Sequence, residues 1–387
     1  MVAIIGVLWF TAFIRAVHAG SEMALTTEQL HTVLCVETIA QRYFTPGKPL
    51  IVSPPASSQE VAPRALRETL SHADDMQLLN AILETLNEKT RWPIELFRPS
   101  GDETADTTAL HHSYILFLWQ EGVMSLRETL ESQVENLKYS TSWNPRGKFL
   151  VVVTASTNDP PNLLAVQVCS TLWQMAYIVN VVVLVTHQLA HPPTNSPSST
   201  HRTGSDRLDL YTWFPYKLGR CGEVQEVILI DQWVSENKGT FSENAYLYPA
   251  KVPKIFTHCP IEVATIGVDP YVILTENYMQ NGGSTEYRVT GLSVDILVLV
   301  FEKMNLTTIF LPPAISTESD PYIKVLSDLE DGLSDVVTGA IPLLPIVVTS
   351  SYDATIPFAR AEMKMLLPCP KPIPGTEKVL TTFSLSG

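Results

Sequence analysis

Apolar runs of strand length alternate with stretches of helical periodicity along most of this chain. Ser113–Trp119 and Lys148–Thr154 are mainly apolar runs, typical of strands buried on both faces of a sheet. Between them, Val123–Leu137 gathers its charged residues on one side of a predicted helix. A strand, a helix and a strand in this order predict βαβ units on a mainly parallel sheet.

The same alternation holds nearer the amino terminus. The apolar positions of Thr26–Gln41 share one helical face, and Thr27 is the expected N-cap. Lys48–Ser53 and Trp92–Phe97 are predicted strands, and the helical stretch Arg64–Glu88 separates them. The fold class expected from these elements is α/β.

The uncharged segment Asn162–Thr186 has the length of a membrane span. Its composition changes midway, because Leu163–Tyr177 is helix-like while Ile178–Val185 is rich in β-branched residues. A spanning helix would not favour strand chemistry in its second half. We therefore favour a helix that leads into a buried strand over a membrane span.

Proline-rich stretches divide the chain. Pro192–Thr200 has the composition of a surface loop or linker. Cys221–Trp233 is a strand or a short helix that closes the first unit, and Tyr246–Pro253 follows as a link. The expected organisation is an amino-terminal α/β domain over residues 20–253 and a second domain over residues 254–387.

The second domain begins with strands. Glu262–Leu274 reads as two strands around a turn at Asp269–Pro270, and Asn281–Ser284 marks a hairpin turn. A helix begins near Gly291 with Ser293 as the expected cap. Its expected apolar face consists of Ile296, Leu297, Val300, Phe301 and Met304. A strand over Thr307–Leu311 and a helix over Pro321–Leu329 complete the pattern.

The stretch Asp331–Pro374 contains two short apolar segments joined by a hydroxyl-rich loop. The first segment is a predicted strand that ends at Ile341–Pro342, and the second is a predicted strand within Ser351–Phe358. Strands that end at one mouth form the ligand clefts of α/β proteins. This stretch therefore predicts a cleft.

The composition and the amino-terminal residues narrow the class of protein to which the chain can belong. A hydrophobic content of 45% and a charged content of 17% indicate a globular chain, and a net charge of −14 argues against a nucleic-acid partner. Val2–Ile14 is an apolar core, and Val17–Ala19 has the small residues that a signal peptidase recognises. Residues 1–19 are therefore a predicted signal peptide. An uncleaved signal anchor is the alternative. Asn305-Leu-Thr307 is a glycosylation sequon that fits an exported chain.

Catalytic chemistry has little support in this sequence. His111 and His112 are adjacent, so on a strand they point to opposite faces and cannot share a metal. Asp331 and Asp335 are better explained as a helix terminus and a strand-entry turn than as a catalytic pair. The chain contains no GxSxG, HExxH, Walker or GxGxxG motif. We expect no enzyme activity, no metal and no cofactor.

The order of motifs after Cys259 resembles the first half of the ligand-binding domain of ionotropic glutamate receptors. It is more similar still to the divergent chemosensory ionotropic receptors of arthropods. The motifs are Pro270–Ile273, Gly291–Asp295, Gly332–Asp335, Ile341–Pro342, Tyr352–Phe358 and Pro368–Pro374. The upstream cluster Trp213–Tyr216, Cys221–Gly222, Asp231–Trp233 and Pro249–Pro253 is similar to that group's variable amino-terminal region.

This resemblance implies periplasmic-binding-protein-like lobes that close on a small ligand and open a cation channel. The ligand-binding positions that it implies are Asp269, Tyr271, Thr308, Pro342, Leu343, Thr349 and Ser350. Amino-acid-sensing members hold a carboxylate with an arginine, and none stands near Val348–Ser350, so a neutral or amine-like ligand is expected rather than glutamate.

The chain has five cysteines, an odd number, so one of them has no disulfide partner within the chain. The preferred disulfide joins Cys221 to Cys259. Cys369 is an expected free thiol.

The sequence ends at Gly387, where that family enters its first membrane helix. The expectation is either the extracellular part of a plasma-membrane receptor, which would need other receptor subunits, or a secreted soluble binding or interaction protein. Sequencing the 3′ end of the transcript distinguishes these two hypotheses.

Overall fold

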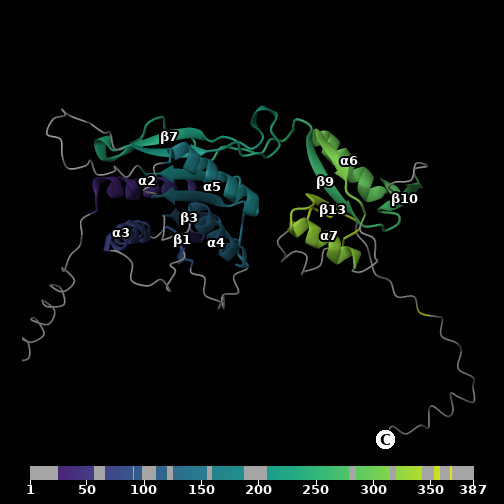
Figure 1. Cartoon of the computed structure of the whole chain (residues 1–387), viewed down its shortest axis with the longest axis horizontal. Helices are drawn as coiled ribbons and strands as arrows, with labels where there is room; N and C mark the ends of the chain where they lie inside the picture. The colour runs from purple at the N-terminus through teal and green to yellow at the C-terminus, as the bar shows by residue number, and fades with distance from the viewer. Residues whose placement is uncertain are drawn as a thin grey trace, which may run out of the picture.

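The computed structural model describes two α/β units. The described residues are 25–55, 66–89, 91–97, 110–119, 125–154, 159–186, 207–278, 285–313, 320–341, 353–357 and 367. The first unit contains an eight-stranded sheet and the second a three-stranded sheet with a hairpin. Figure 1 shows the two units beside each other, with the second beyond the helix α5. The predicted α/β class with binding-protein-like lobes is confirmed.

The first sheet has the strand order β2-β1-β3-β4-β5-β6-β7-β8. Neighbouring strands from β2 to β5 are parallel, and those from β5 to β8 are antiparallel. The strands are β1 (Leu50–Ser53), β2 (Ile94–Leu96), β3 (Ser113–Leu118), β4 (Lys148–Val153), β5 (Val181–Val185), β6 (Arg207–Thr212), β7 (Ile228–Val234) and β8 (Thr240–Phe241). Single-turn 3-10 helices span Lys217–Gly219 and Glu236–Lys238. The prediction of a mainly parallel sheet is therefore correct for its first five strands.

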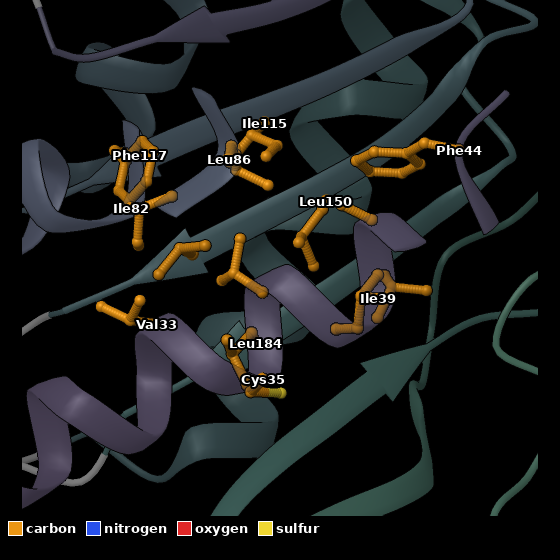
Figure 2. Packing of buried hydrophobic residues seen from close by; sticks show 14 of the residues in the cluster. Val33, Cys35, Ile39, Phe44, Ile82, Leu86, Ile115, Phe117, Leu150 and Leu184 are labelled. Atoms are coloured by element: carbon orange, nitrogen blue, oxygen red, sulfur yellow. The ribbon is translucent and has the colours of Figure 1, made fainter. Parts of the chain in front are cut away.

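Helices cover both faces of this sheet. The helices are α2 (Thr27–Tyr43), α3 (Leu66–Glu88), α4 (Leu126–Lys138) and α5 (Pro161–Ala176). Alternate residues of β3 explain the two layers, since Ile115 and Phe117 pack with α2 and α3 while Leu116 and Leu118 pack with α4 and α5. Figure 2 shows the first layer, in which Val33 and Ile39 of α2 lie against the sheet. Every residue of β3 is buried because neither face meets water.

The segment with the length of a membrane span folds as a helix followed by a strand. It contains α5 and β5, and all five residues of β5 are buried in the sheet. This prediction is confirmed. Within the described ranges, no helix combines the length and the apolar character that crossing a bilayer would need.

Two helix starts carry reciprocal caps. Thr26, rather than the expected Thr27, is the N-cap of α2, and its hydroxyl and the side chain of Gln29 exchange hydrogen bonds with each other's backbone. Ser125 and Glu128 make the same capping box at α4. The sequence correctly predicted a threonine cap for α2, but the predicted cap lies one residue after the observed one.

The second unit is a smaller doubly wound sheet. Its parallel strands have the order β12-β9-β13, and β10 and β11 form a separate antiparallel pair. The elements are β9 (Cys259–Thr265), β10 (Ile273–Tyr278), β11 (Thr285–Thr290), α6 (Leu292–Met304), β12 (Leu306–Phe310), α7 (Pro321–Glu330) and β13 (Val336–Thr338). The predicted hairpin, the helices and the strands up to β13 are present, although the turn residues Asn281–Ser284 lie outside the described residues. The strand predicted after the hydroxyl-rich loop is wrong for the residues that the structure describes there, because Asp353–Pro357 forms no strand.

The start of α6 differs from the prediction. Gly291 is the N-cap, at φ 126°, and Ser293 is a buried residue within the first turn. The expected apolar face is also only partly right, because Phe301 is buried while Val300 is 46% exposed. The sheet contacts α6 through Val294 and Phe301, which leaves Leu299 and Val300 toward solvent.

The units meet through the amino ends of their strands, here called the amino edges. A disulfide joins Cys221, which follows β6, to Cys259 at the start of β9, with a Cα–Cα distance of 5.3 Å. The rings of Tyr216 and Phe256 lie 5.0 Å apart in an edge-to-face contact. Tyr177, just before β5, approaches Gly332 so closely that a Cβ there would lie 2.7 Å from the Tyr177 hydroxyl. The carboxyl edges of both sheets therefore point away from the contact between the units.

Candidate functional site

The second sheet has a strand-order reversal at its central strand. From β9 the chain crosses to β12 on one side and then to β13 on the other. Ligands of open α/β sheets bind outside the carboxyl ends of the strands at such a reversal. Here that place lies beyond Thr265 of β9 and Thr338 of β13, on the edge opposite the first unit.

The backbones are close together at this edge. The Ile266 amide donates to the Thr338 carbonyl at 3.1 Å, and a Cβ on Gly339 would lie 2.8 Å from that of Ile266. A glycine at position 339 permits this approach. The Thr265 side chain is fully buried beside it, and its hydroxyl has no hydrogen-bond partner among the described contacts.

Two predicted ligand residues lie at the loop that follows β9. Asp269 is exposed and Tyr271 is half-buried. Their loop is held on the first turn of α6, because the amide of Leu292 donates to the Pro270 carbonyl at 3.2 Å and that of Ser293 to the Tyr271 carbonyl at 3.0 Å. The loop thus uses two of the free amides at this helix start, and these two hydrogen bonds fix its backbone.

The other predicted ligand residues are placed differently. Thr308 is half-buried within β12, where it pairs with Ile261, so it lies on the sheet rather than at the carboxyl edge with Tyr271. Pro342, Leu343, Thr349 and Ser350 lie outside the described residues. Among the described positions, only Asp269 and Tyr271 are therefore brought together.

The glycosylation sequon follows α6. Asn305 ends the helix in the left-handed conformation, and its side-chain amide donates to the Phe256 carbonyl at 2.7 Å. The Thr307 hydroxyl donates to the His258 carbonyl at 3.3 Å. Both sequon side chains thus hold the segment that enters β9, and glycosylation of Asn305 stays a prediction.

The cysteines divide into a bonded pair and buried thiols. Cys221 and Cys259 form the disulfide that the sequence analysis preferred. Cys35 and Cys169 are free and fully buried. Burial raises the pKa of both thiols, to about 12 for Cys169, which keeps them protonated and unreactive. Cys369 lies outside the described residues.

A polar row at the carboxyl edge of the first sheet was not predicted from the sequence. Trp119, Thr154 and Thr186 directly follow the parallel neighbours β3, β4 and β5, and each is at least 94% buried. The Thr154 hydroxyl donates to the carboxylate of the buried Asp75 on α3 at 2.8 Å. A threonine directly after each of the β-branched runs of β4 and β5 was the available signal.

Two other buried charges have backbone partners. The Asp231 carboxylate accepts hydrogen bonds from the amides of Gln232, Glu243 and Ala245 at 2.8 to 2.9 Å, which fixes the turn after β8. The Lys251 ammonium donates to the carbonyls of Val179 and Val181 and to the Thr212 hydroxyl. These two groups are structural.

Lys251 also shows that the proline-bounded link is packed on the first unit. Burial lowers the pKa of its ammonium from 10.5 to about 8. Nearby, Leu247 and Tyr248 are buried, and the Tyr248 hydroxyl donates to the Phe149 carbonyl at 3.2 Å. The first unit therefore continues structurally through Lys251.

Metal-binding groups do not gather in the described part of the chain. No set of three or more histidine, cysteine, aspartate or glutamate side chains there could hold an ion.

Comparison with known families gives one match. Residues 64–254 match the model of a family described as "Putative ionotropic receptor, ligand binding domain". The match covers just under half of the chain and falls on the first unit, from the start of α3 to the end of the link. A comparison with curated proteins finds no match. This similarity supports a ligand-sensing receptor portion and favours a receptor over an enzyme.

The match and the sequence motifs fall on different parts of the chain. The motifs that resemble ionotropic receptors lie mainly after Cys259, whereas the matched residues end at Lys254. The family match therefore supports the similarity for the first unit, and the resemblance of the second unit to ionotropic receptors stays a prediction.

Proposed function

We propose that this chain is the extracellular, ligand-sensing portion of a chemosensory ligand-gated cation channel. The observation that carries the proposal is the match of residues 64–254 to an ionotropic receptor ligand-binding domain. The geometry of the second unit agrees with it, because a strand-order reversal leaves its carboxyl edge away from the first unit. A small molecule bound at that edge would contact the loop that contains Asp269 and Tyr271.

The proposed ligand is neutral or amine-like. An α-carboxylate needs a cationic partner, and a bidentate guanidinium suits it best. The stretch Val348–Ser350, where the resemblance puts such an arginine, contains only an apolar residue and two hydroxyls. We propose that Pro342, Leu343, Thr349 and Ser350 complete this site, and we leave out Thr308 because it lies within β12, away from the loop of Tyr271.

A binding experiment on the whole secreted chain tests this function. We expect compounds from a panel of neutral and amine volatiles to raise the melting temperature, and L-glutamate to leave it unchanged. Tyr271→Ala should weaken the best binder at least tenfold. Tyr139→Ala, a substitution of an 85% exposed tyrosine in the first unit, is the matched control and should have no effect.

Tight glutamate binding would refute the proposed ligand class. Equal affinity of the Tyr271→Ala and Tyr139→Ala variants would refute the proposed place of the site. Sequencing the 3′ end of the transcript tests the channel: coding sequence for membrane helices supports it, and a stop codon after Gly387 supports a secreted binding protein instead.

A further inference from the structure

The strand β12 lies at one edge of the second sheet. Within the described part of the chain it pairs with β9 and with no other strand. The disulfide holds the first unit at the amino end of β9, so that unit lies at the end of the strands rather than alongside β12. Among the residues that the structure describes, one long side of β12 is therefore open to another strand.

The open side of β12 presents backbone groups at alternate residues. The Leu311 amide donates to the Val263 carbonyl at 2.9 Å, and this bond fixes which groups of β12 face β9. Because backbone groups of a strand alternate between its two sides, the amides and carbonyls of Leu306, Thr308 and Phe310 face the open side. The described backbone offers them no partner there.

This edge lacks the features that protect the other edge strands. The strands β2, β8 and β13 are only two or three residues long. The strands β10 and β11 contain the charged residues Glu276, Glu286 and Arg288. By contrast, β12 has five residues, and Leu306–Phe310 contains neither a charge nor a proline. Short length, charge and proline keep strand edges from pairing with another chain, so β12 is the edge best suited to accept a strand.

An antiparallel copy of β12 is complementary to this edge. A two-fold axis through Thr308 puts this residue opposite its own copy, where the two residues exchange both backbone hydrogen bonds. The same axis puts Leu306 opposite Phe310 of the second copy, and Thr307 opposite Ile309. These pairs combine apolar, aromatic and β-branched residues, which stabilise antiparallel sheets, and no like charges meet. Ile309 is 42% exposed, so the pairing also covers an apolar side chain.

Size and charge set the strength of such a contact. Five residues from each copy bury less than the roughly 1,200 Å² at which standard interfaces begin, so the dimer is weak and reversible. Each copy has a net charge of −14, so two copies repel each other at low salt. The contact itself is uncharged, and salt therefore strengthens it by screening the repulsion.

We propose that two copies of this chain associate through Leu306–Phe310, paired antiparallel about a two-fold axis at Thr308. This contact is here called the β12 seam, and it makes one continuous sheet from the second units of both copies. The seam goes beyond the proposed function, because binding a ligand near Tyr271 does not require it.

Sedimentation velocity of the whole secreted chain tests the β12 seam. We expect a reversible equilibrium of monomer and dimer in the micromolar range. Raising sodium chloride from about 50 mM to about 500 mM should tighten the dimer at least twofold. Ile309→Lys puts a charge on the open strand and should weaken the dimer at least tenfold. Ile323→Lys, the same change at a 67% exposed isoleucine of α7, is the matched control and should stay within twofold.

A cross-link provides a second test that does not need a stable dimer. Two residues that form a hydrogen-bonded antiparallel pair have Cα atoms about 5.5 Å apart, which is within the range that a disulfide spans. Thr308→Cys should therefore form an intermolecular disulfide under mild oxidation, visible as a dimer on a non-reducing gel. Ile323→Cys keeps all other cysteines and is the control, so its cross-linked fraction should be at least tenfold lower. This test decides if Ile309→Lys fails to fold.

Four results would overturn the proposal. They are a chain that stays monomeric throughout the micromolar range, equal dimer affinity of folded Ile309→Lys and Ile323→Lys, equal cross-linking of the two cysteine variants, and a dimer that weakens as salt is added. A monomer whose melting temperature falls in Ile309→Lys would instead assign the open edge to another segment of the same chain. Tyr271→Ala should leave the dimer unchanged, so the ligand site and the seam are tested separately.

Discussion

Lys251 shows how one side chain holds the link between the units against the first sheet. Its three N–H groups meet three acceptors, two of which are the carbonyls of Val179 and Val181 at the start of β5. Burial nevertheless disfavours the charge and lowers its pKa to about 8. The ammonium thus orders the link while adding a desolvation cost to the folded state.

This cost predicts a pH dependence. The folded chain releases the Lys251 proton near pH 8, while the unfolded chain keeps it to about pH 10.4, so stability from this group rises with pH across that window. Between pH 7.5 and 9.5 the gain is about 2 kcal/mol. Urea denaturation of the unmodified chain and of Lys251→Met at both pH values measures it. The difference in the free energy of unfolding between the two proteins should change by this amount from pH 7.5 to pH 9.5. A difference that stays constant would contradict the low pKa of Lys251.

Gly291 is a residue whose backbone conformation is required at the proposed ligand loop. It adopts φ 126°, and a Cβ there would overlap the Tyr271 carbonyl oxygen. Gly291→Ala should cost about 2 kcal/mol or more and separate the loop from α6. Hydrogen exchange of the Leu292 and Ser293 amides should become faster. Gly47→Ala, at φ 73° with open space around it, is the control and should leave those amides protected.

At the scale of elements, helix starts decide where the covering helices lie on the first sheet. The Ser125–Glu128 capping box satisfies amides at the start of α4 near the carboxyl end of β3. The helix then buries Leu130, Val134 and Leu137 against the sheet. The amphipathic pattern of α4 determines which face of the helix is buried, and the cap determines at which residue the helix begins.

Removal of this cap should destabilise the first unit measurably. Ser125→Ala should lower the free energy of unfolding by about 1 kcal/mol, because an amide of the first turn loses its acceptor. Ser235→Ala is the control, since Ser235 precedes a 3-10 helix without making a side-chain cap bond. Urea denaturation followed by circular dichroism compares them, and equal midpoints would contradict the role of the cap.

At the scale of the whole molecule, the two units are joined at the amino edges of their sheets. The disulfide closes a separation of 38 residues between Cys221 and Cys259. A loop of this length implies a stabilisation of up to about 4 kcal/mol in the chain-entropy model. The exposed Val252 and Ile255 lie in the segment that the disulfide spans.

Loss of this disulfide should free the connection between the units. The double variant Cys221→Ser/Cys259→Ser should be cleaved several-fold faster by protease between Val252 and His258, because the segment then loses its covalent link to the first unit and keeps the ring contact of Phe256 and its hydrogen bonds to the end of α6. Iodoacetamide should leave Cys35 and Cys169 unmodified in the native chain, since both are fully buried. Peptide mapping without reductant that links Cys35 to either disulfide cysteine would contradict the pairing.

The proposed site was predictable only in part. The motif order placed Asp269 and Tyr271 in one loop, and the structure keeps them together at a strand end. Thr308 was implied by resemblance and lies within a strand, away from that loop. The row of Trp119, Thr154 and Thr186 needs the register of three parallel strands, which pairs residues more than thirty positions apart, and no local pattern specifies such pairs.

The sequence by itself determined most of the elements of this protein and their order. Period-two and period-3.6 patterns depend on neighbouring residues, so they identified the buried strands, the helix–strand nature of residues 162–186 and the α/β class. The tertiary structure decided which strand ends meet, that Asp75 lies over Thr154, and that the units join by their amino edges. Those outcomes depend on strand order and on contacts between distant segments, because packing across the sheet, not local preference, sets their free energy.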